Sequence, residues 1–73
     1  MNSNESFGRR IRRLRVEKGY SQGDLAGRLY VTVQAVSRWE TERGYPSIES
    51  VVNMAHVFAT STDYLLTGQE AIR

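Results

Sequence analysis

The chain has 73 residues, no cysteine and a formal net charge of +2. A chain of this length forms one domain with a small core and buries only about 60% of the surface that its unfolded form exposes. Without cysteine there is no disulfide framework, thiol nucleophile or Cys-based metal site, and no apolar run is long enough to cross a membrane. We therefore expect a soluble, intracellular domain in the cytoplasm.

The first helix is predicted over residues 6–18. Residues 1–5 carry no pattern and are expected to be disordered. Ser6 is a suitable N-cap, and Phe7, Ile11 and Leu14 recur at helical spacing to form one apolar stripe. Gly19 follows where a residue of positive φ is needed to end the helix.

Basic residues crowd this first helix. It carries a single acid, Glu17, against Arg9, Arg10, Arg12, Arg13, Arg15 and Lys18. A basic half of a small domain is suited to a polyanion such as nucleic acid. The alternative is that this charged face is only solvated.

Two short helices joined by a tight turn are predicted over residues 21–42. Ser21 is an N-cap, and Asp24 completes a capping box three residues later. The helical pattern ends at Tyr30, and Thr32 is a suitable N-cap for a second helix over 33–42. This arrangement is a helix-turn-helix, and in its DNA-binding versions the second helix lies in the major groove.

Two further helices are predicted after Pro46. The first runs over 47–58 and is expected to supply the central core layer through Ile48, Val51, Val52, Ala55 and Phe58. The second is capped by Ser61 and stopped by Gly68. His56 lies on the flank of the apolar stripe, and with no second His or Cys nearby it is expected to be a surface or core-edge residue.

Several segments, in order and spacing, resemble the phage-repressor or Cro-like helix-turn-helix family, also called the XRE family. They are L-R-V-E-K-G-Y-S-Q-G-D-L-A, S-R-W-E, P-S-I-E-S-V-V-N-M-A and S-T-D-Y-L-L-T-G, besides the helix-turn-helix itself. The resemblance covers about residues 7–68. It implies an all-α, compact five-helix, lambda-repressor-like domain over residues 6–68, with a disordered tail over 69–73.

The resemblance also implies roles for individual residues. Arg15 and Glu40 are expected to form an ion pair that holds the first helix against the third, and Trp39 is expected to face the core. Tyr30 and Glu42 occupy positions where the family often has glycine, so the turn is expected to be strained and Gly44 is a candidate for the second bend.

Base reading requires hydrogen-bonding side chains on the third helix. Gln34 can pair with N6 and N7 of adenine, and Arg38 can pair with O6 and N7 of guanine. By resemblance, Val33 and Ser37 also occupy reading positions, where Val33 can contact only a thymine methyl.

Phosphate contacts are expected from helix starts and from basic residues. The candidates are Ser21, Gln22, Thr32, Arg43, Arg10 and Arg13.

One such domain covers half of a site, so the resemblance implies a homodimer on a near-palindromic, double-stranded operator. The dimer surface is expected on the last helix and its flanks, at Tyr64 and Leu65, and the alternative is that Leu65 and Leu66 only complete the core of the monomer. The expected function is sequence-specific transcription regulation, as a repressor. The alternative is a protein-interaction module on the same fold, either antitoxin-like or an adaptor. No enzyme activity, metal, cofactor, small-molecule ligand or membrane partner is expected.

Overall fold

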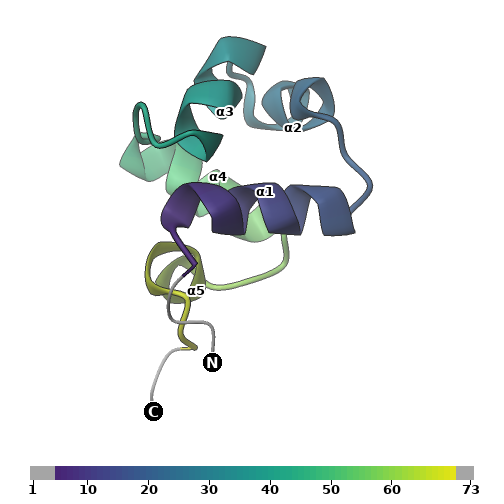
Figure 1. Cartoon of the computed structure of the whole chain (residues 1–73). Coiled ribbons are helices and arrows are strands. Elements are labelled where there is room, and N and C mark those ends of the chain that lie inside the picture. Colours follow the sequence, from purple (N-terminus) through teal and green to yellow (C-terminus); the bar gives the residue numbers. More distant parts are fainter. Residues whose placement is uncertain (1–4, 71–73) are drawn as a thin grey trace.

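The computed structural model describes residues 5–70 and contains five helices and no strand in that part of the chain. They are α1 (Phe7–Glu17), α2 (Gln22–Leu29), α3 (Val33–Glu40), α4 (Ile48–Val57) and α5 (Thr62–Thr67). Helices α2 and α3 lie on one side of α1 and α5 on the other, with α4 completing the bundle (Figure 1). The predicted all-α fold of five helices is confirmed. Within residues 5–70 no helix is both long and apolar enough for a membrane span.

The predicted disordered ends lie mostly outside the described residues. Of residues 1–5 and 69–73, the structure describes only Glu5, Gln69 and Glu70. Glu5 is not a free end, because its carboxylate oxygens accept hydrogen bonds from Arg13 Nε at 2.7 Å and Nη2 at 3.0 Å.

Every helix begins at a serine or threonine N-cap. In each case the side-chain oxygen accepts a hydrogen bond from the backbone N–H three residues later; the caps are Ser6, Ser21, Thr32, Ser47 and Ser61. The predicted capping box is confirmed, since Asp24 Oδ2 also accepts from the Ser21 N–H at 2.9 Å. Each cap stabilises its helix by about 1 kcal/mol, so these boundaries are encoded locally.

The core differs from its prediction on α4. Trp39 is buried as expected, and the fully buried large side chains are Ile11, Leu25, Met54, Leu65 and Val36. The core positions predicted for Ile48 and Val52 are wrong, because these side chains are 84% and 41% exposed. Helix α4 contacts α2 and α5, and the face turned toward them carries Met54 in their place.

The turn after α2 has the predicted left-handed residue. Tyr30 has φ 59° and ψ 40°. The prediction that Gly44 makes the second bend is wrong, because Glu42, with φ 63°, makes it and Gly44 does not have positive φ. Helix α3 consequently ends at Glu40 rather than at 42.

Candidate nucleic-acid interface

A buried ion pair fixes α3 against α1. Arg15 Nε donates to Glu40 Oε2 at 2.7 Å and Nη2 donates to Oε1 at 3.1 Å. The side chains are only 11% and 3% exposed. Arg15 Nη1 also donates to the carbonyl oxygen of Tyr20 at 2.9 Å, and Gln22 Nε2 donates to Glu40 Oε1 at 3.0 Å. The predicted pair is confirmed, and through Gln22 it also ties the start of α2 to α3.

A second link joins the start of α1 to the end of α3, and the sequence analysis missed it. The Gly8 N–H donates to Glu42 Oε2 at 2.6 Å, and Tyr45 Oη donates to Glu42 Oε1 at 3.1 Å. These hydrogen bonds, with that from Gly8 foremost, hold the pKa of Glu42 below its ordinary value. A Cβ on Gly8 would lie 2.5 Å from the Trp39 carbonyl oxygen. Only glycine therefore allows this close approach.

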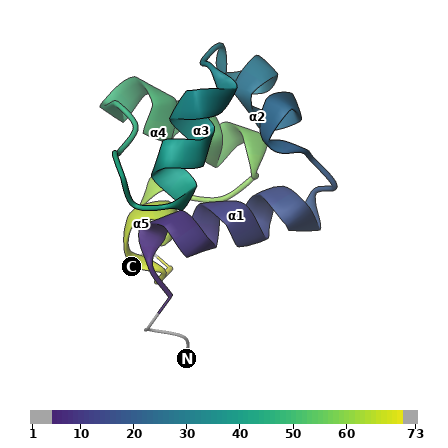
Figure 2. The ribbon, with the colours of Figure 1, turned by 45° about the horizontal axis from the view of Figure 1, so that its top comes forward.

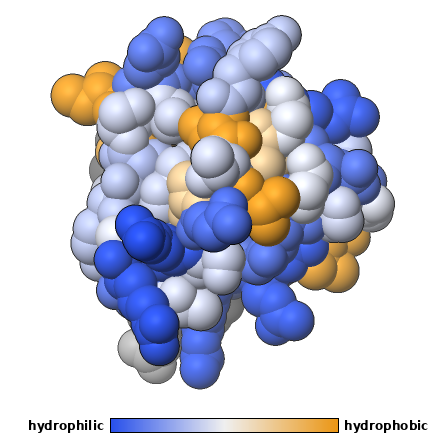
Figure 3. All heavy atoms as spheres, turned by 90° about the horizontal axis from the view of Figure 1, so that it is seen from above, coloured by the Kyte–Doolittle hydropathy of each residue, from blue (hydrophilic) through white to orange (hydrophobic). Residues whose placement is uncertain are grey.

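The outward face of α3 carries the predicted reading residues. Gln34 and Arg38 are exposed, Val33 is 45% exposed and Ser37 is half-buried. Helix α3 lies at the surface of the molecule beside α2 (Figure 2). Seen from above, that end is mostly hydrophilic with a few small apolar spots (Figure 3). Among residues 5–70, Arg38 forms no ion pair with a carboxylate. The structure thus brings the four predicted base-reading residues onto one short helix with polar groups free toward solvent.

The predicted phosphate-contacting residues fall into two groups. Ser21, Thr32 and Arg43 are exposed, and Gln22 is half-buried at the start of α2. The hydroxyl oxygens of Ser21 and Thr32 accept cap hydrogen bonds, which leaves each hydroxyl proton available to a phosphate oxygen. These four stay candidates.

The two predicted phosphate contacts from α1 do not fit the structure. The prediction that Arg10 contacts phosphate is wrong, because Arg10 is 4% exposed and its guanidinium donates to the carbonyl oxygens of Leu65 at 3.0 Å and Glu5 at 2.7 Å. Arg13 is occupied as well: besides Glu5 it donates to Glu17 at 3.2 Å and to Tyr64 Oη at 2.6 Å. The Glu5 hydrogen bond is the main reason that the pKa of Arg13 is raised. Both guanidinium groups serve the packing of α1 against α5.

The predicted dimer surface is partly wrong. Leu65 has 0% exposure and belongs to the core, and Tyr64 is half-buried with its hydroxyl bonded to Arg13. The apolar surface lies next to them, in a shallow groove between the start of α4 and α5. Its lining is Pro46, Ile48, Val51, Val52, Thr62 and Leu66. Neighbouring residues of a helix point in different directions, and in α5 Leu65 points into the core and Leu66 to solvent. The spacing of apolar residues in so short a helix does not show which of the two is buried.

No metal centre is formed within residues 5–70, where no group of three or more His, Cys, Asp or Glu side chains could hold an ion. His56 is exposed, as a surface histidine is expected to be.

The sequence profile of the helix-turn-helix family matches residues 11–65. The transcriptional activator BcrR of Enterococcus faecalis is 39% identical over 66 residues, which is 90% of this chain and 32% of BcrR. The prophage-derived regulator YonR of Bacillus subtilis is 34% identical over 65 residues, 89% of this chain and 60% of YonR. The chain thus spans between a third and about three fifths of these two relatives.

The fold is also similar to that of a repressor whose structure has been solved in complex with DNA. The P22 c2 repressor bound to a synthetic operator superimposes with a TM-score of 0.86 at 30% identity, covering 90% of this chain and 100% of the repressor chain. The profile match covers α2, α3 and α4 completely and most of α1 and α5. The chain therefore belongs to the helix-turn-helix family, in its phage-repressor or XRE form.

Proposed function

We propose that this chain is the DNA-binding module of a transcription regulator and that it reads operator DNA in the major groove with α3. One observation carries the proposal: α3 is held by a buried bidentate ion pair on its inner side and presents on its outer side exposed hydrogen-bonding side chains that have no partner within residues 5–70. A rigid helix with a free polar face suits base recognition, since register has to be fixed before bases can be distinguished.

The chemistry of the reading face assigns a role to each residue. Gln34 pairs with adenine through its amide, Arg38 pairs with guanine through its guanidinium, and each correct pair is worth about 1–3 kcal/mol of discrimination. Val33 contacts a thymine methyl, and Ser37 is a further reading position on the same helix. Affinity comes mainly from phosphates, through Ser21, Gln22, Thr32 and Arg43.

Two copies are proposed to bind one near-palindromic operator. The apolar groove with Ile48, Val52 and Leu66 is the surface for the second copy, in place of Leu65. The patch is small, so association is weak in free solution and is completed on DNA. A protein that occupies an operator in this way represses transcription simply by excluding other proteins, and it acts where the DNA is, in the cytoplasm.

The first experiment is selection of binding sites from a random duplex library. The expected product is a two-fold symmetric site. Gln34→Ala and Arg38→Ala should each relax preference at one base position by about 5- to 150-fold, which corresponds to about 1–3 kcal/mol. Gln69→Ala is the matched amide control, because Gln69 is exposed near the end of the described chain. If no site is enriched, or if both α3 variants select the same site as the wild type, the proposal fails.

The dimer surface has its own test. Leu66→Asp places a charge on the exposed rim of the groove and should leave one protomer on each half-site, without the cooperative second protomer. Asp63→Asn is the control, because Asp63 is exposed on the same helix and outside the groove lining. Two protomers bound cooperatively by the Leu66→Asp variant would assign dimerisation to another surface.

The alternative function, an antitoxin-like or adaptor module, is favoured by the same apolar groove if its occupant is a different protein. It predicts tight binding of a protein partner that Leu66→Asp abolishes, together with no enriched DNA site. The selection experiment therefore separates the two functions.

A further inference from the structure

The five arginines of α1 divide into two groups that the sequence does not distinguish. Arg10, Arg13 and Arg15 are used inside the domain, each bonded to carbonyl or carboxylate oxygens. Arg9 and Arg12 are exposed, and neither forms an ion pair within residues 5–70. They are three positions apart, so they project from the same face of the helix.

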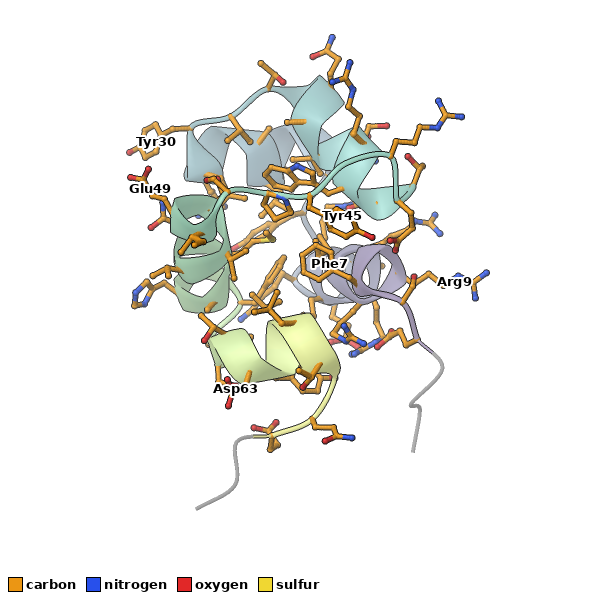
Figure 4. The ribbon with its side chains drawn as sticks, turned by 90° about the vertical axis from the view of Figure 1, so that its left-hand side faces the viewer. Phe7, Arg9, Tyr30, Tyr45, Glu49 and Asp63 are labelled. Atoms are coloured by element: carbon orange, nitrogen blue, oxygen red, sulfur yellow. The ribbon has the colours of Figure 1, made fainter. Side chains whose placement is uncertain are left out.

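Helix α1, which carries this free pair, packs against the reading helix. The Arg43 N–H donates to the Arg38 carbonyl oxygen at 2.8 Å, and Glu42, the residue before Arg43, is bonded to the N–H of Gly8. The contact between Gly8 and Glu42 thus places the start of α1 against the loop that carries Arg43. Figure 4 shows Arg9 extending outward from the start of α1, on the side where α3 ends.

We infer that four exposed arginines, Arg38, Arg43, Arg9 and Arg12, form a basic strip. In this strip Arg9 and Arg12 bind the phosphate backbone that flanks the half-site read by α3. The inference rests on the proposed DNA binding and adds a second, sequence-independent contact region to it. Arg10 and Arg13, the α1 residues that the sequence favoured, have no part in it.

The charge balance along the strip favours phosphate as the occupant. Two acids lie near the strip, and both are already engaged. The carboxylate oxygens of Glu42 accept hydrogen bonds from Gly8 and Tyr45, and Glu17, which lines the same surface hollow as Arg9 and Arg12, is paired with Arg13 at 3.2 Å. Beyond Arg12 the same helix face continues with Val16, an apolar side chain that is 57% exposed, and there the strip ends. A basic row continuous with a helix in the major groove meets the groove wall, which is phosphate.

The test is the salt dependence of binding to the selected operator with several flanking base pairs on each side. Arg9→Ala should lower the log–log salt slope by about 0.9 and weaken binding about tenfold at 0.1 M salt, with the base preference unchanged. Arg12→Ala should act in the same direction, and Arg9→Lys should restore most of the slope. Lys18→Ala is the matched control, because it removes one exposed charge just beyond the other end of α1.

Trimming the duplex distinguishes the flank from the half-site. On a duplex that ends at the edges of the read sequence, wild type and Arg9→Ala should bind equally. The inference is overturned if Arg9→Ala changes the slope no more than Lys18→Ala does, or if its effect persists on the trimmed duplex. A wild-type chain with no base preference would refute the proposed function alone, and the slopes of Arg9→Ala and Lys18→Ala on duplex of arbitrary sequence would then decide the inference.

Discussion

Two glycine-to-alanine changes should have opposite effects on stability, for reasons visible in the contacts. At Gly8 a new Cβ would lie 2.5 Å from the Trp39 carbonyl oxygen and 2.7 Å from the Glu40 carbonyl oxygen. Both neighbours are backbone atoms, so α1 and the end of α3 must separate. At Gly27, which lies inside α2, a new Cβ would meet nothing within 4 Å.

The magnitudes follow from the kind of contact. Overpacking of this type costs about 1–3 kcal/mol, and separating the helices also lengthens the Gly8 hydrogen bond to the Glu42 carboxylate, worth about 1.5–3 kcal/mol. Gly8→Ala should thus lower the free energy of unfolding by about 2–5 kcal/mol. Gly27→Ala should raise it by about 0.5–1 kcal/mol, because alanine restricts the unfolded chain and favours the helix.

Thermal unfolding followed by circular dichroism measures both changes. For a domain of this size each kcal/mol shifts Tm by about 4–8 °C, so Gly8→Ala should melt at least ~8 °C lower and Gly27→Ala a few degrees higher. A Gly8→Ala variant as stable as the wild type would refute the close approach of α1 to α3. Equal effects of the two substitutions would show that helix propensity, rather than contact, governs both sites.

Three other predictions concern the ends and the inner side of α3. The pKa of Glu42 is lowered from 4.5 chiefly by the Gly8 hydrogen bond. The contribution of the Glu42 carboxylate to stability is therefore complete above that pH and is lost as the pH falls through the lower folded-state pKa. Glu42→Gln should make Tm less pH-dependent in acid, and an unchanged acid limb in a Tm–pH series would contradict this. Removing Arg15 alone should cost about 3–5 kcal/mol, because Glu40 is left buried without a cationic partner and keeps only the hydrogen bond from Gln22. Arg15→Met with Glu40→Leu should cost less than the two single changes together, and additive effects in urea titrations would exclude a coupled pair. Tyr30→Gly should raise stability by up to about 1 kcal/mol by relieving the left-handed strain, partly offset by chain entropy; Tyr30→Ala serves as the control, and a gain as large from alanine would assign the cost to the exposed ring.

Much of the fold could be predicted because the signals are local. The N-caps act within three residues and the capping box at Ser21 and Asp24 within one turn, whereas the left-handed bend at Tyr30 was expected from the family resemblance and not from a local signal. The ion pair between Arg15 and Glu40 came from resemblance rather than from spacing, and its 25-residue separation in sequence leaves no local signal.

The predictions that failed depend on how the helices face one another. Helical spacing places Ile48 and Val52 on an apolar stripe, but the direction of α4 relative to α2 and α5 turns them to solvent and Met54 inward. Leu65 and Leu66 are adjacent and equally apolar, yet one is fully buried and the other is 55% exposed.

The starts of the helices and the chemistry available on α3 could be predicted from capping, periodicity and residue type, and the class of the domain from its resemblance to the phage-repressor family. Only the tertiary structure decided which of the equivalent arginines of α1 are free and which residue makes the bend after α3. The physical reason is that a guanidinium group bonds to whatever oxygen the packing brings within 3 Å or so. For Arg10 that oxygen is the carbonyl oxygen of Leu65, 55 residues away in sequence. The bend at Glu42 likewise depends on a distant partner, because its carboxylate accepts from the backbone N–H of Gly8, 34 residues away.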